Sequence, residues 1–205
     1  MRDAKANELI NRNDMMTNAQ CCEIFGIRDI QNLPSAALEI VLGDNDRRHD
    51  VYRQLLEVNN YDVSFDWFQK IYEAEMSEGK RKGQHFSPPE LYRLVAEIVG
   101  NDTGSVHEPT AGTGGLIIGD WWRKCSSVNP WRWKPWELPY YAWELSDRAV
   151  PLLLINLSIR GIHALVYHGD TLERTVYAKY AIYNTNNDPL AFSEVKQVEI
   201  EEKIL

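Results

Sequence analysis

A glycine-rich segment is the strongest candidate for chemistry in this sequence. Residues 106–118 read VHEPTAGTGGLII, so an apolar run is followed by three glycines within four positions and then by a second apolar run. Glycine permits sharp turns and lets a ligand approach backbone N–H groups with no Cβ in the way. The segment matches neither GxGxxG nor GxxxxGK[ST], so a nucleotide phosphate is not the expected ligand. A tight turn without a ligand is the alternative interpretation.

Three acidic residues follow apolar runs that are typical of strands. Glu108 closes the first run, Glu144 closes YYAWE at 140–144, and Asp170 follows LVYHG at 165–169. A carboxylate at the end of a strand can accept hydrogen bonds from both hydroxyls of a ribose, as in dinucleotide-binding folds. Taken singly, each acid is more often a helix cap or a surface charge, but three at successive strand ends favour a ligand site.

The elements that must position these residues alternate along the second part of the chain. The pattern predicts helices at 89–99, 115–124 and 148–160, and strands at 105–108, 140–144, 164–168 and 180–183. Strand, loop and helix in repetition indicate the α/β class with a parallel, doubly wound sheet. Ligands of such sheets bind beyond the carboxyl ends of the strands, where the glycine segment and the three acids are expected.

The first part of the chain shows only helix signals. Helices are predicted at 36–42 and 46–58, and a third from about residue 62 or 64. Gly43 is expected to end the first of them in a left-handed conformation. The polar, glycine-bounded segment 77–83 is typical of a linker. We therefore expect a helical N-terminal module, 1–78, followed by an α/β domain, 79–205.

In their order and spacing these motifs resemble the N6-adenine DNA methyltransferases of the type I restriction–modification modification-subunit kind. The similarity begins at YDVSFDWF (61–68) and continues through GQHFSPP (83–89), EPTAGTGGLI (108–117), ELS (144–146) and GDTL (169–172). The resemblance implies a Rossmann-like methyltransferase fold with S-adenosyl-L-methionine as cofactor. Because the family pattern continues past the length of this chain, a partial sheet is expected.

The resemblance also implies roles for individual residues. A lid over the cofactor would contain Gln84, Phe86, Ser87 and Pro88. The methionine part would be cradled by Glu108, Thr110, Gly112 and Gly114. Glu144 would hold the ribose and Asp170 the adenine.

The position of the family's catalytic signature is occupied by Asn184. The family signature is an Asn or Asp, two prolines and an aromatic: the polar side chain and a backbone carbonyl accept hydrogen bonds from the amino group of a flipped adenine, and the aromatic stacks on the base. Here Thr185, Asn186 and Asn187 replace the prolines and the aromatic. Two functions therefore stay open. One is an S-adenosylmethionine-dependent DNA adenine-N6 methyltransferase, or a subunit of one. The other is a catalytically degenerate S-adenosylmethionine-binding protein that regulates or interferes with a restriction–modification complex.

The charge of the chain bears on its partners. With 22 basic and 30 acidic residues the formal net charge is -8, which lacks the overall basic character of an autonomous DNA binder. DNA contact is thus expected to need a local groove or a partner subunit, and a protein partner or a homo-oligomer is expected as well. An acidic decoy that imitates DNA is a third alternative function. The Trp-rich segment 121–143, which also carries basic residues, is consistent with packing, a protein interface or nucleic-acid stacking.

Other features exclude further classes. The sequence has no run of eighteen apolar residues and no signal-peptide pattern at its start, so a cytoplasmic protein is expected. Its three cysteines form no CxxC pair and its histidines no HxxxH pair, so no zinc site is predicted and the cysteines are expected to be packed thiols.

Overall fold

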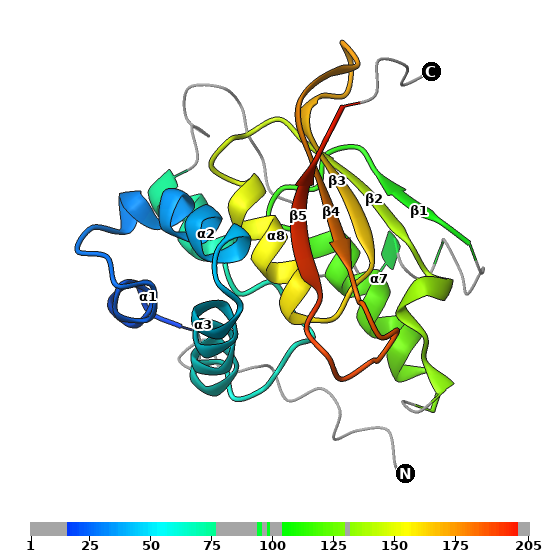
Figure 1. Ribbon diagram of the computed structural model, residues 1–205, viewed down its shortest axis with the longest axis horizontal. Coiled ribbons are helices and arrows are strands. Elements are labelled where there is room, and N and C mark those ends of the chain that lie inside the picture. Colours follow the sequence, from blue (N-terminus) through cyan, green and yellow to red (C-terminus); the bar gives the residue numbers. More distant parts are fainter. Residues whose placement is uncertain (1–15, 77–93, 96–97, 99–103, 130–131, 201–205) are drawn as a thin grey trace.

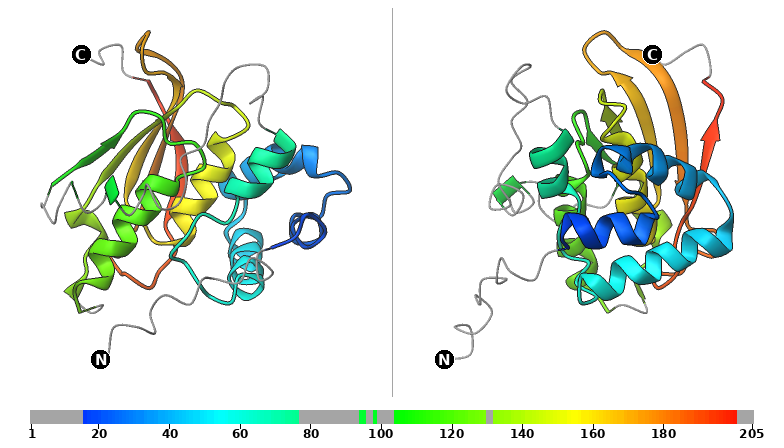
Figure 2. Two further views of the ribbon diagram at one scale, coloured as in Figure 1. Left: turned by 180° about the vertical axis from the view of Figure 1, so that it is seen from behind. Right: turned by 90° about the vertical axis from the view of Figure 1, so that its left-hand side faces the viewer.

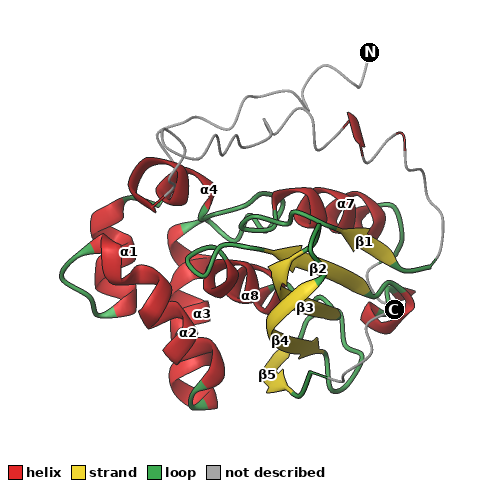
Figure 3. Ribbon diagram, turned by 90° about the horizontal axis from the view of Figure 1, so that it is seen from above, coloured by secondary structure: helices red, strands yellow, loops and turns green. Residues whose placement is uncertain are grey.

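The computed structural model describes residues 16–76, 94–95, 98, 104–129 and 132–200. They form a mixed α/β structure around a five-stranded sheet (Figure 1). The strands are β1 (Val106–Glu108), β2 (Tyr140–Glu144), β3 (Ala164–Asp170), β4 (Thr175–Tyr183) and β5 (Glu194–Val198). Viewed from above, the labelled helices all lie on one side of the sheet (Figure 3).

The sheet is parallel in one half and antiparallel in the other. β1, β2 and β3 are parallel, whereas β4 runs antiparallel to β3 and β5 antiparallel to β4. The strands lie in the order β1-β2-β3-β4-β5, which does not reverse among the described strands. The prediction of an all-parallel, doubly wound sheet is therefore wrong for the antiparallel part, β4 and β5. The predicted α/β class is confirmed.

The reason lies in the length of the connection after β3. Only four residues, 171–174, separate β3 from β4, and Arg174 has a positive φ of 53°. A parallel neighbour needs a crossover of about a dozen residues, so a connection this short permits only a hairpin. The predicted strand 180–183 is consequently the second half of a longer strand that runs back toward the start of β3.

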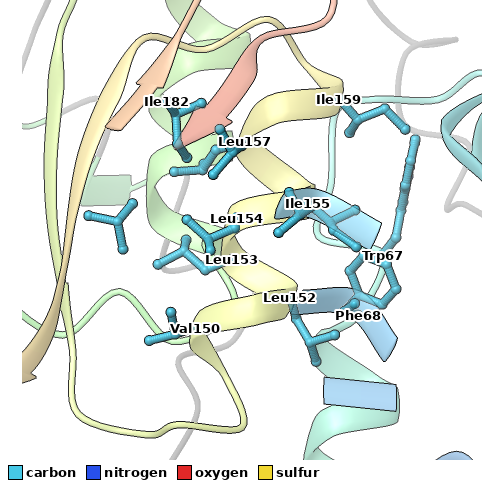
Figure 4. Packing of buried hydrophobic residues seen from close by; sticks show 14 of the residues in the cluster. Trp67, Phe68, Val150, Leu152, Leu153, Leu154, Ile155, Leu157, Ile159 and Ile182 are labelled. Atoms are coloured by element: carbon cyan, nitrogen blue, oxygen red, sulfur yellow. The ribbon is translucent and has the colours of Figure 1, made fainter. Parts of the chain in front are cut away.

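Two helices connect the parallel strands. They are α7 (Gly115–Ser126) and α8 (Val150–Ile159), and α8 is the more deeply buried of the two. Every residue of α8 is buried, because the helix lies between the sheet and the N-terminal helices. Figure 4 shows Ile182 of β4 on one side of α8 and Trp67 and Phe68 on the other.

The N-terminal helices pack against α8 on its side away from the sheet (Figure 2). They are α1 (Asn18–Phe25), η1 (Ile30–Asn32), α2 (Leu33–Leu42), α3 (Asn45–Val58), α4 (Gln69–Ile71) and the π-helical turn η2 (Tyr72–Met76). Asp44 caps α3 by accepting from the N–H groups of Asp46 and Arg47, which explains why the predicted helix 46–58 is confirmed almost to the residue.

Two helix boundaries differ from the prediction. α2 starts at Leu33, with Pro34 in its first turn, and Gly43 after it is extended (φ −87°) and not left-handed. The third helix starts at Gln69, because Asp62 accepts from the N–H of Ser64 and Asp66 from those of Phe68 and Gln69. These local bonds hold 62–68 as a series of turns in place of a helix.

A single hydrophobic cluster contains buried residues of both the helical module and the sheet. The predicted boundary at 78/79, the linker 77–83 and nearly all of the predicted helix 89–99 lie outside the described residues. Of the helices in the described part, none is long and apolar enough to cross a membrane.

Candidate functional site

The structure gathers the three acids of the sequence prediction at one edge of the sheet. Glu108, Glu144 and Asp170 are the last residues of β1, β2 and β3, and these strands are parallel neighbours. Thr171 Oγ1 donates to the carbonyl oxygen of Pro109 at 2.7 Å, which joins the loop after β3 to the loop after β1. We call this end of the sheet, with the loops that follow the three strands, the carboxyl edge.

The glycine loop, residues 109–114, turns sharply into α7. Gly112 and Gly114 have φ values of 56° and 109°, and the latter is essentially restricted to glycine. A Cβ on Gly114 would lie 3.0 Å from Leu153 Cδ1 of α8, so a larger residue there would crowd the packing between α7 and α8. The N–H of Ala111 donates to the carbonyl oxygen of Trp143 at 2.8 Å and fixes the loop against β2.

Glu144 connects the glycine loop to the loop after β2. Its Oε2 accepts from the N–H of Gly112 and its Oε1 from the N–H of Ser146, both at 2.7 Å. Each carboxylate oxygen can accept more than one hydrogen bond, and the side chain is only half-buried. Glu144 is thus held in a defined orientation and can still accept from two hydroxyl groups of a ligand.

The other two acids also shape the turns in which they lie. Glu108 Oε1 accepts from the N–H and the hydroxyl of Thr110, and Asp170 Oδ1 accepts from the N–H groups of Leu172 and Glu173. The second oxygen of each carboxylate has no hydrogen-bond partner in the part of the chain that the structure describes. Neither acid caps a helix: each holds the turn that follows its strand and keeps an oxygen for a ligand.

The N-terminus of α7 adds a group of opposite polarity. Gly114 caps this helix without a side-chain hydrogen bond, and its first turn contains no acidic residue. The first N–H groups of a helix and its dipole favour a negative charge. The carboxyl edge can therefore hold one molecule that has a cationic or hydroxylated part near the acids and a carboxylate near α7.

Two exposed apolar residues at this edge escaped the sequence prediction. Leu145, directly after Glu144, is 57% exposed, and Leu172, two residues after Asp170, is 94% exposed. Apolar side chains beside convergent polar groups are typical of a ligand site and offer surface to a flat ring. Their position just after the strand-end acids is the sequence feature that could have identified them as part of a ligand site.

Asn184 lies elsewhere. Because β4 is antiparallel to β3, its last residues pair with Ala164 at the start of β3, so the residue after β4 lies at the end of the sheet opposite the carboxyl edge. Asn184 is completely buried, its Nδ2 donates to the carbonyl oxygens of Gly161, Asp188 and Ala191, and its Oδ1 accepts from the N–H of Asp188. The structure therefore does not bring Asn184 to the glycine loop, and its side chain holds a turn together.

The Trp-rich segment is largely used for packing. Trp121 is buried, Trp143 stacks on Tyr167 across the sheet with ring centroids 4.8 Å apart, and Trp136 donates from its indole N–H to the carbonyl oxygen of Asn184. Trp122 and Trp136 remain partly exposed, at 41% and 53%. Packing therefore accounts for most of the described rings, and Trp131 lies outside the described residues.

The other sequence predictions concern the lid, the cysteines and a metal site. Gln84, Phe86, Ser87 and Pro88, the predicted lid, lie outside the described residues. Burial raises the pKa of Cys21 to about 12 and that of Cys125 to about 11, as expected for packed thiols. Among the described residues, no three His, Cys, Asp or Glu side chains come close enough to hold a metal ion.

A family model and a known protein are similar to part of this chain. The family model described as N-6 DNA Methylase matches residues 63–190, which include the glycine loop and all three strand-end acids. The type I restriction enzyme HindI methylase subunit of Haemophilus influenzae is 28% identical over 86 residues, which make up 42% of this chain and 18% of that protein. The aligned region thus spans less than a fifth of the length of this relative.

Proposed function

Because the chain belongs to the N-6 DNA methylase family, we propose that it binds S-adenosyl-L-methionine at the carboxyl edge and takes part in methylating adenine N6 in DNA. The parallel part of the sheet, β1 to β3 with α7 and α8, would then be the cofactor-binding part of a Rossmann-like methyltransferase fold. The proposed place of action is the cytoplasm.

The observation that carries this proposal is the hydrogen bond from the Gly112 N–H to Glu144. It sets a glycine loop and a strand-end acid against each other in a fixed geometry, although they are 32 residues apart in sequence. The bond holds the glycine loop and Glu144 side by side at the carboxyl edge, where both could contact one ligand. The second oxygens of Glu108 and Asp170, the remaining acceptor capacity of Glu144 and the N-terminus of α7, which has no side-chain cap, supply groups that suit a zwitterionic nucleoside.

The residues divide between the parts of the cofactor. Glu144 would accept from the ribose hydroxyls and Asp170 from the adenine amino group, with Leu145 and Leu172 against the ring. The glycine loop, Glu108 and Thr110 would hold the methionine part, with its carboxylate toward α7 and its ammonium toward Glu108. When bound, S-adenosylmethionine supplies a methyl group, which its positively charged sulfur activates toward attack by a nucleophile. Gln84, Phe86, Ser87 and Pro88 are proposed as its lid.

The DNA side of the reaction is proposed to depend on another chain. The H. influenzae relative is named as a methylase subunit of a type I restriction enzyme, which motivates a partner subunit for this chain too. The burial of Asn184 favours the second candidate function, a cofactor-binding protein that regulates or interferes with a restriction–modification complex. In the first candidate function another subunit would supply the groups that hold the target adenine, and in the second this chain would transfer no methyl group.

Calorimetry tests the cofactor site. We expect saturable binding of S-adenosylmethionine by the full chain and a loss of affinity of at least about tenfold in Glu144→Ala, because hydrogen bonds to a charged group are lost. Glu137→Ala is the matched control, since this exposed acid precedes β2 at the opposite end of the sheet. Equal affinities of the two variants, or no binding by the unmodified chain, would contradict the proposed site.

Label transfer separates the two functions. Tritiated S-adenosylmethionine and unmethylated DNA are incubated with the chain alone and together with the other subunits of a type I complex. Labelled DNA in the first reaction indicates a complete methyltransferase, and labelled DNA only in the second indicates a subunit. Cofactor binding with no labelled DNA in either reaction indicates the regulatory protein.

A further inference from the structure

A buried polar network joins the helical module to the glycine loop. Asp66 Oδ2 accepts from Thr113 Oγ1 at 2.5 Å, and Asp66 Oδ1 accepts from Asn156 Nδ2 at 2.7 Å. The same Asn156 Nδ2 donates to the carbonyl oxygen of Thr113 at 2.8 Å. Their exposed fractions are 6%, 2% and 0% for Asp66, Thr113 and Asn156, so water does not compete for these bonds.

Arg160, at the end of α8, fixes the loop that carries Asp66. Its guanidinium donates to the carbonyl oxygens of Val63 and Phe65 and to Asn156, and it lies 4.5 Å from the centre of the Trp67 ring. Burial lowers the pKa of Arg160 to about 9, and the carboxylate of Asp66 opposes this shift, so the group remains protonated at neutral pH. The loop 62–68 is therefore held against α8 on both sides of Asp66.

The network determines the orientation of one peptide group in the glycine loop. The carbonyl oxygen of Thr113 accepts from Asn156, and the N–H of Gly114 donates to the carbonyl oxygen of Ala111 at 2.9 Å. Both ends of the 113–114 peptide are thus occupied inside the protein. This peptide immediately precedes the first turn of α7, so it determines where the first N–H groups of that helix point.

A second bond reaches the loop after β2. The Tyr72 hydroxyl lies 2.7 Å from Ser146 Oγ, and the N–H of Ser146 donates to Glu144. Burial raises the pKa of Tyr72, which keeps its hydroxyl protonated and able to donate. The helical module therefore contacts both loops of the carboxyl edge, at Thr113 and at Ser146.

We propose that the helical module shapes the cofactor site through two pairs of positioning residues: Asp66 with Thr113 for the methionine part, and Tyr72 with Ser146 for the nucleoside. This inference rests on the proposed function. None of the four residues needs to touch the cofactor, because each acts through the backbone or the carboxylate that does. The helical module is on this view a working part of the methylase and not a separate attachment.

Two probes distinguish positioning from general stability. Affinity is measured by calorimetry for S-adenosylmethionine and for 5′-methylthioadenosine, which keeps the adenine, ribose and sulfur but lacks the aminobutyrate chain. Thr113→Val and Asp66→Asn are expected to weaken binding of S-adenosylmethionine about tenfold and that of 5′-methylthioadenosine less than about twofold. Tyr72→Phe is expected to weaken both about fivefold, since both contain the ribose that Glu144 holds.

Matched variants keep the experiment decisive. Thr113→Ser retains the hydroxyl and is expected to bind both probes like the unmodified chain. Tyr52→Phe removes another buried hydroxyl, which pairs with Ser158 between α3 and α8 and is remote from the carboxyl edge. It is expected to lower the free energy of unfolding in urea and leave both affinities unchanged. Should Asp66→Asn not fold, the comparison of Thr113→Val with Thr113→Ser decides alone.

The outcomes separate the two levels of the proposal. If the unmodified chain binds both probes and Thr113→Val weakens both equally, or neither, the helical module does not position the methionine part and this inference is overturned. An equal loss of affinity in Tyr52→Phe would also overturn it, because general stability would then explain the effect. If the unmodified chain binds neither probe, the proposed function itself fails and the inference fails with it.

Discussion

The two ends of the sheet use polar residues in opposite ways. At the carboxyl edge, Glu108, Glu144 and Asp170 are half-buried, and each forms only some of the hydrogen bonds that a carboxylate can accept. At the opposite end Asn184 is completely buried, and both its amide nitrogen and its oxygen are bonded to backbone groups. Spare hydrogen-bonding capacity marks a site that can bind a ligand, whereas saturation marks a structural residue.

The largest expected effect is on stability, at the saturated end. Asn184→Ala removes one acceptor and several donor contacts from a buried turn and is expected to lower the free energy of unfolding by about 3 kcal/mol. Urea denaturation measures it, with Asn186→Ala as control, because Asn186 is exposed two residues away. If the two variants were equally stable, the structural role of Asn184 would have to be abandoned.

A smaller effect is expected at the carboxyl edge, where stability and binding should change together. Gly114→Ala introduces a Cβ at φ 109° beside Leu153 and is expected to cost about 2 kcal/mol of stability and to weaken cofactor binding. Gly26→Ala, at φ 68° with open space around it, is expected to cost about 1 kcal/mol and to leave binding unchanged. Thermal unfolding and calorimetry of both variants test the comparison, which fails if Gly26→Ala also loses affinity.

Trp136 tests the saturated end without emptying the core. Trp136→Phe removes the indole N–H that donates to the carbonyl oxygen of Asn184 at 2.7 Å and keeps most of the half-exposed ring surface. We expect a loss of about 1 kcal/mol in the free energy of unfolding and unchanged affinity for S-adenosylmethionine. A change in affinity would show that the two ends of the sheet are coupled.

The smallest effect concerns pH. Burial lowers the pKa of His163 below its ordinary value of 6.5, so the folded protein keeps it neutral where the unfolded chain already takes up a proton. Acidification through pH 6.5 therefore favours the unfolded state, and stability is lost as the pH falls. Urea denaturation between pH 7.5 and 5 should show a steeper loss for the unmodified chain than for His163→Gln, and parallel curves would exclude the effect.

The local patterns predicted much of the fold and of the candidate site. Strand-end acids, the glycine loop and the helix 46–58 depend on a few neighbouring residues, so β2, the start of α7 and nearly all of α3 are where the patterns predict them. The turns at 62–68 were missed, because Asp62 and Asp66 compete with a helix through bonds that hydrophobic spacing does not reveal. The Asp66–Thr113 contact could not be predicted, since it joins residues 47 positions apart.

By itself the sequence determined the α/β class, the glycine loop and the three acids, because each depends on backbone conformation and side-chain chemistry within a short stretch of chain. The direction of β4, the position of Asn184 and the attachment of the helical module to the carboxyl edge were decided only by the tertiary structure. Strand direction depends on what pairs with what, and a buried polar residue acquires its role from the partners that the whole fold brings to it.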